Sequence, residues 1–98
     1  MFQGTTPTHK FMTDISTDLI SKVRIIYEQN GKVVLTKHKE DCTLEGRTIT
    51  TKLTQEDTLK FATGSARVQL HVRVTNGDAF TNKPITVPVY ILLDKAVI

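Results

Sequence analysis

The stretch Ala66-Arg67-Val68-Gln69-Leu70-His71-Val72-Arg73-Val74 alternates strictly between apolar and polar side chains. In an extended chain its five apolar or small residues fall on one face, and Arg67, Gln69, His71 and Arg73 fall on the other. This period of two predicts an antiparallel β-strand with one buried and one solvent-exposed face. The strand is expected to end at the turn signal Asn76-Gly77-Asp78.

Alternation of the same kind predicts strands on both sides of this stretch. Residues 85–92 (ITVPVYIL) alternate, and Pro88 cannot donate to a ladder, so we expect that strand at a sheet edge or at a bulge. Residues 47–53 place Ile49, Thr51 and Leu53 on one face. Residues 9–15 are a weaker candidate, which Phe11 would anchor.

Asn30-Gly31 joins two further strand candidates, residues 23–29 and 32–39. The dipeptide suits a type I′ hairpin, because both turn positions need positive φ. Tyr27, with Val23 and Ile25, is expected on one face of this hairpin, and Ile26 and Leu35 on the other. This second apolar set leaves the hairpin register open.

Two short segments are typical of single helical turns rather than strands. Residues 16–22 (STDLISK) offer Ser16 or Thr17 as a cap. Residues 53–61 (LTQEDTLKF) offer Thr54 as N-cap and Asp57 as the partner in a capping box. Leu59 and Phe61 would then close one end of the domain, so this turn is expected to carry the chain from one sheet to the other.

About six to eight short strands with regular turn signals predict an all-β antiparallel domain, either a sandwich or a small barrel. The 98 residues suffice for one domain, 1–98, with residues 1–8 as a flexible N-terminal segment. The N-terminus lacks the charged and apolar regions of a secretory signal, and no apolar run approaches a membrane span. We therefore expect no signal peptide and no membrane partner.

No residue pattern indicates an enzyme. Cys42 is the only cysteine, and it follows Glu40 and Asp41, which would raise its pKa rather than activate it. His9, His38 and His71 lack the spacing of a metal motif. The glycines are isolated at turns, so no phosphate-cradling loop is present. The sequence predicts no catalytic residue, no metal and no cofactor.

Two surfaces are candidates for interaction. The C-terminal residues Leu92, Leu93, Val97 and Ile98 either pack on this domain or contact another chain. Lys22, Arg24, Arg67 and Arg73 could share a basic sheet face that follows a nucleic-acid backbone. The aromatic platform that oligonucleotide binders use for stacking is missing, so this second interpretation is not favoured.

The chain resembles small β-sandwich proteins of phage and prophage particles, in particular the immunoglobulin-like N-terminal domain of phage baseplate upper proteins. The matching segments are HKFMTDI, VRIIYEQNGKVVL, GRTITTKLTQEDTLKF, ARVQLHVRVTNGDAF and ITVPVYIL, which together cover roughly residues 9–92. The resemblance implies an immunoglobulin-like sandwich without catalytic residues. It also implies a place in the virion, and in the host cytoplasm during assembly.

From these observations we expect a non-enzymatic structural or interaction module of a phage or prophage particle, in its tail, baseplate or head–tail region. Its partners would be other virion proteins or copies of itself, so we expect a homo-oligomer. The first alternative is a small basic nucleic-acid-binding protein. A second alternative is a carbohydrate-binding sandwich, for which exposed aromatic residues are scarce.

Overall fold

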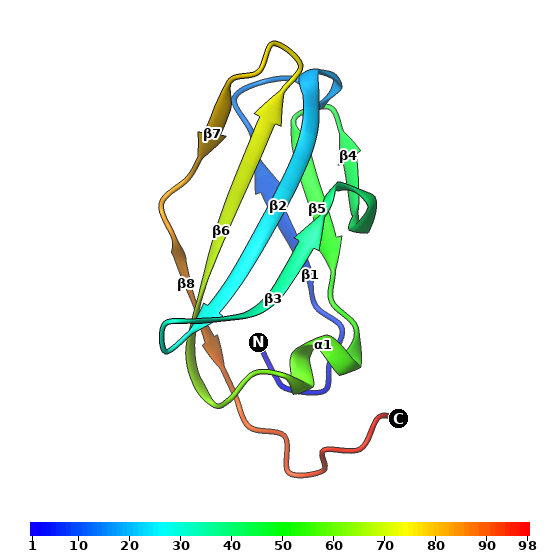
Figure 1. Ribbon diagram of the computed structural model, residues 1–98. Coiled ribbons are helices and arrows are strands. Elements are labelled where there is room, and N and C mark those ends of the chain that lie inside the picture. The colour runs from blue at the N-terminus through cyan, green and yellow to red at the C-terminus, as the bar shows by residue number, and fades with distance from the viewer.

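Eight strands form two antiparallel sheets in the computed structural model, which describes residues 1–98. One sheet has the order β1 (Thr8–Met12), β5 (Thr48–Lys52), β4 (Cys42–Glu45). The other is built on β2 (Ile20–Gln29) and β6 (Gly64–Val74). β3 (Lys32–His38) pairs with β2, while β7 (Ala79–Thr81) and β8 (Ile85–Val89) both pair with β6. Figure 1 shows the second sheet lying in front of the first.

The connectivity is that of an immunoglobulin-like sandwich. β1, β5 and β4 take the places of strands B, E and D in one sheet, and β3, β2 and β6 take those of C′, C and F in the other. β7 and β8 together occupy the place of strand G. The predicted fold class, an antiparallel sandwich with short helical turns, is therefore confirmed. A chain with one cysteine and no tryptophan lacks the disulfide and Trp that mark antibody domains.

The β2–β3 hairpin has the predicted turn, and the structure gives the register that the sequence left open. Asn30 and Gly31 have φ of 53° and 79°, as a type I′ turn requires. A bulge shifts the register between Tyr27 and Glu28, so that Tyr27 pairs with Leu35. Leu35 is therefore buried beside Tyr27, and the expectation that it shares the outer face with Ile26 was wrong.

The core lies between the two sheets, and the sequence predicted most of it. The face of alternating apolar residues in β6 is buried, as are Ile49, Thr51 and Leu53 of residues 47–53 and Phe11 of β1. Tyr27 and Phe61 are fully or almost fully buried, and their rings meet edge to face at 5.8 Å. Phe61 thus closes the sandwich at the end where α1 lies (Figure 1).

Three single turns connect the strands: η1 (Thr17–Leu19), η2 (Lys39–Asp41) and α1 (Gln55–Leu59). Ser16 caps η1, and Thr54 caps α1 in a capping box with Asp57, as predicted. α1 carries the chain from β5 in one sheet to β6 in the other. None of these helices is long and apolar enough to cross a membrane.

The first residues are held against the domain, in contrast to the flexible segment that we expected over residues 1–8. Gln3 is buried, and its Nε2 donates to the carbonyl of Phe61 at 2.6 Å. Phe2 forms a parallel bridge with Tyr90, and Thr8 already belongs to β1. The segment is fixed because the Gln3 side chain forms hydrogen bonds with the carbonyl of Phe61 and the N–H of Leu92 at the open end of the sandwich. A polar stretch of sequence does not reveal such a role.

Candidate functional site

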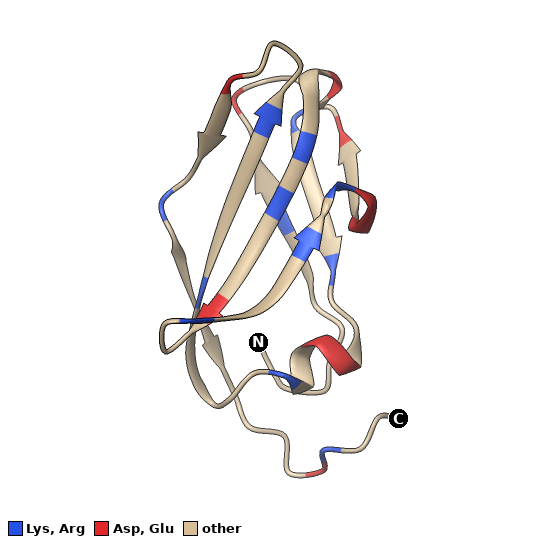
Figure 2. Ribbon diagram, viewed as in Figure 1, with Lys and Arg blue, Asp and Glu red and all other residues tan.

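A basic patch crosses three neighbouring strands on the outer face of the β2–β6 sheet. The polar positions of β2 and β6 point outward because their apolar partners enter the core. The register places Lys22 opposite Arg73, and Arg24 between His71 on one side and His38 on the other. Figure 2 shows basic positions side by side on β2 and β6. On β3 the patch continues with His38, whereas Lys37 is paired with Asp57. The predicted neighbours Lys22, Arg24 and Arg73 are therefore together in the structure.

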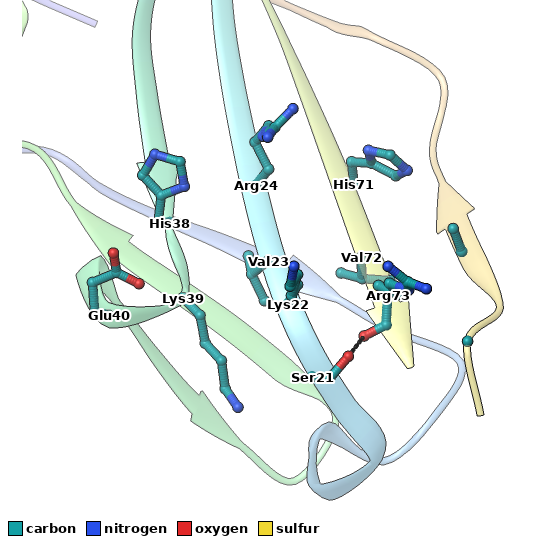
Figure 3. Close-up of a pocket in the computed structure, with 12 residues that line it drawn as sticks. Ser21, Lys22, Val23, Arg24, His38, Lys39, Glu40, His71, Val72 and Arg73 are labelled. Carbon is teal, nitrogen blue, oxygen red and sulfur yellow. Dashed lines mark hydrogen bonds between the residues drawn. The ribbon is translucent and has the colours of Figure 1, made fainter. Parts of the chain in front are cut away.

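The patch forms the floor of an open hollow of about 650 Å³. Its walls are the η2 turn, with Lys39 and Glu40, and the two residues Gly77 and Ala79. In the close-up the side chains of Arg24, His38 and His71 project from three adjacent strands (Figure 3). The hydroxyl of Ser21 donates to the carbonyl of Arg73 at 3.0 Å, which ties β2 to β6 at this point. We call the residues that line this cavity the basic hollow. Its ionisable members are Lys22, Arg24, His38, Lys39, Glu40, His71 and Arg73.

Arg67 lies on the same face but outside the hollow. Its guanidinium donates through Nη2 and Nε to both carboxylate oxygens of Glu28, at 2.6 and 3.3 Å, across the β2–β6 pairing. The hydrogen bonds raise the pKa of Arg67 and lower the pKa of Glu28. Arg67 is thus already neutralised, and the structure separates it from the three other basic residues of the predicted face.

An apolar surface covers the end of the sandwich where the chain terminus lies. Leu93 and Ile98 are 91% and 98% exposed, and Ile91 and Val97 are more than half exposed. The exposed rings of Phe2 and Tyr90 lie 4.9 Å apart beside them. We call this set the terminal apolar surface: Phe2, Tyr90, Ile91, Leu93, Val97 and Ile98.

Hydrogen bonds tie the terminal segment to the domain, and Leu92 is its one apolar side chain that packs inward, against Gly4. The backbone N–H of Leu92 donates to Oε1 of Gln3 at 3.1 Å, and Lys95 also donates to that oxygen. The N–H of Ile98 donates to Oε1 of Gln55 in α1 at 3.1 Å. Of the four predicted residues, only Leu92 is partly buried. The structure therefore fixes the path of the segment and leaves Leu93, Val97 and Ile98 facing solvent.

A smaller apolar groove lies at one margin of the sandwich, between β1 and β7. Met12 and Phe80, which are 74% and 52% exposed, line it with Ile15 and the inner residues Leu70 and Val72. β1 pairs only with β5, so its outer edge is unpaired. The sequence did not indicate this groove.

Three titratable side chains outside these surfaces, His9, Tyr27 and Cys42, have pKa values shifted by burial. Nδ1 of His9 lies 2.6 Å from Oη of the buried Tyr27, and burial lowers the pKa of His9 and raises that of Tyr27. Burial, more than the neighbouring Asp41 that we expected to act, raises the pKa of Cys42. No group of three or more His, Cys, Asp or Glu side chains lies together in a way that could hold a metal ion.

Asp57 is the most heavily engaged carboxylate. It accepts from Nζ of Lys37 at 2.7 Å and from the N–H of Thr54 at 2.9 Å, and so joins α1 to β3. Burial alone would raise the pKa of Asp57, but these hydrogen bonds outweigh it and lower the pKa. The side chains of Lys37 and Asp57 are only 13% and 12% exposed. This burial at the end of the sandwich indicates a structural role.

Comparison with known proteins adds little to this description. No protein-family description matches the sequence, and no curated protein matches it. Among solved structures, the V domain of amphioxus IgVJ-C2 is similar at a TM-score of 0.39 and 14% identity. The similarity covers 94% of this chain and 97% of that domain. A likeness of this size carries no argument about function.

Proposed function

We propose that this chain is a non-enzymatic interaction module that assembles with copies of itself and with other proteins of a phage or prophage particle. The tail, baseplate or head–tail region is the place that the sequence resemblance favours. The observation that carries the assembly proposal is the terminal apolar surface, whose side chains remain exposed although the backbone beneath them is fixed. Contiguous exposed apolar side chains are typical of protein–protein contact sites.

Assembly through this surface needs little reorganisation. The hydrogen bonds of Gln3 and Gln55 already hold the terminal segment in place, so ordering it costs little on association. Leu93 and Ile98 would supply apolar contact area, and the paired rings of Phe2 and Tyr90 would extend it. Each contact is small, but a particle built from many copies of the chain would combine the binding free energy of many such contacts.

The test is the solution mass, measured by light scattering over a range of concentrations. We expect the unmodified chain to form a defined oligomer, and Leu93→Glu with Ile98→Glu to return it to a monomer. Both residues are more than 90% exposed, so the charges should not disturb the fold. Burying an unpaired carboxylate in a contact opposes association strongly.

Leu19→Glu is the matched control, because Leu19 is an exposed apolar residue of η1 outside the terminal apolar surface. It should leave the oligomer intact. A monomer at every concentration would contradict self-assembly, and so would an oligomer that survives the double substitution but is lost with Leu19→Glu.

A further inference from the structure

We propose that the basic hollow binds the phosphate backbone of a nucleic-acid duplex. This inference goes beyond assembly and rests on other residues, on the outer face of the β2–β6 sheet. Three features of the hollow support this: its unpaired charge, the spacing of its cations, and a lining without apolar anchors or large aromatic side chains.

The cations of the hollow lack carboxylate partners. The two ion pairs of the structure are Lys37–Asp57 and Arg67–Glu28, so Lys22, Arg24 and Arg73 take part in neither. Lys22 stands directly opposite Arg73 in the β2–β6 ladder, and like charges in that arrangement destabilise a sheet. A bound anion would remove this repulsion. Glu40 is the single acidic residue that lines the hollow.

The spacing of the charges suits a polyanion rather than a single small ion. Neighbouring strands lie about 4.8 Å apart, and alternate residues along one strand are separated by about 6.7 Å. Lys22, Arg24 and Arg73 therefore present three separate cations over a patch about 10 Å across. A nucleic-acid duplex carries one negative charge for about every 1.7 Å of its axis, so a stretch as long as the patch offers enough phosphates for all three cations at once.

The lining of the hollow favours phosphate over a protein partner or unpaired bases. Its valines, Val23 and Val72, are 4% and 6% exposed because they enter the core, so they offer no anchor for an apolar side chain. No Phe, Tyr or Trp lines the hollow, and its only rings are the small imidazoles of His38 and His71. Contacts to the backbone of a duplex need neither feature.

The test measures fluorescence anisotropy of a labelled DNA duplex of about 20 base pairs, titrated with the intact chain between about 50 and 200 mM salt. We expect the logarithm of the binding constant to fall against the logarithm of the salt concentration with a slope of about −2.7, for three neutralised phosphates. Arg24→Gln and Arg73→Gln should each weaken binding several-fold and reduce the slope by about 0.9. A single strand of the same sequence should bind more weakly.

Arg67→Gln is the matched control. It removes the same charge from the same strand face, but its guanidinium is already bound to Glu28. It should leave the affinity for the duplex unchanged, and circular dichroism should show that all three variants are folded. Equal losses for Arg67→Gln and Arg24→Gln would overturn the site, since net charge would then explain the binding. Binding of polyglutamate but not of the duplex would also overturn it, in favour of an acidic protein partner.

Discussion

Asp57 shows how one side chain can fix both a helix start and the junction between two parts of the sandwich. Its carboxylate accepts from the N–H of Thr54, while the Thr54 hydroxyl accepts from the N–H of Asp57 at 3.1 Å. The same carboxylate pairs with Lys37, whose side chain is only 13% exposed. Replacing the carboxylate by a neutral amide would leave the Lys37 ammonium without its counter-charge and would weaken the bond from the Thr54 N–H.

We therefore expect Asp57→Asn to lower the free energy of unfolding at neutral pH by about 2 kcal/mol. The pKa of Asp57 is lower in the folded state, so the unfolded chain binds the proton more readily in acid. The stabilisation is present above the ordinary carboxyl pKa of 3.8 and is lost as pH falls through the folded value. Urea unfolding should therefore show a large difference from the unmodified chain at pH 7 that shrinks in acid.

Glu56→Gln is the control for this measurement, since Glu56 is an exposed neighbour in the same turn that takes part in no ion pair. It should change the stability by only a few tenths of a kcal/mol. A difference for Asp57→Asn that stays constant from neutral to acidic pH would show that the charge of Asp57 is not what stabilises the junction.

At the scale of elements, Gly4 joins the first residues to the terminal segment. It has φ of 73°, and a Cβ placed there would collide with the side chain of Leu92. Gly31, at φ of 79° in the β2–β3 turn, has open space at the same position. The two glycines share the backbone conformation that favours glycine, and they differ in what surrounds them.

This difference predicts the outcome of alanine substitution. Gly31→Ala should cost about 1 kcal/mol, through the positive φ alone. Gly4→Ala should cost more and should also displace Leu92, which would loosen the terminal segment. Thermal unfolding measures the first effect, and limited proteolysis within residues 91–98 measures the second. Equal costs, with no change in proteolysis, would show that Leu92 does not pack on Gly4.

The strands that the sequence predicted are those long enough to show a clear alternation of apolar and polar residues. β6, with eleven residues, and the hairpin turn at Asn30-Gly31 were readable directly. β4 and β7 were missed, because strands of four and three residues barely complete an alternation. The bulge in β3 was also invisible: an unbroken two-residue hairpin would put Lys37, not His38, opposite Arg24.

At the scale of the whole molecule, the same limit decides how much of the candidate sites could be predicted. Alternation within β2 and within β6 predicted that Lys22, Arg24 and Arg73 lie on the polar faces of their strands. It could not show that His38 and Lys39 join them, or that Glu28 neutralises Arg67, because both depend on the register between strands. Likewise the apolar terminal residues were evident in the sequence, whereas the buried Gln3 that fixes their path was not.

The sandwich thus presents two chemically different surfaces in different places. The terminal apolar surface belongs to the end of the sandwich near α1, where Figure 1 shows the C-terminal segment, and the basic hollow lies on the outer face of the β2–β6 sheet. A contact made through one leaves the other open. An assembly of such modules could therefore present its basic hollows together, without the two kinds of contact competing for the same residues.

Amide hydrogen exchange of the intact chain, at low and at high concentration, tests assembly through the terminal apolar surface most directly. We expect protection to rise with concentration in residues 91–98 and around Phe2, and to stay unchanged in the groove between β1 and β7. Exchange in the terminal segment that is fast at every concentration would contradict the claim. Protection that appears instead at Met12 and Phe80 would contradict it as well, because association would then use the free edge of β1.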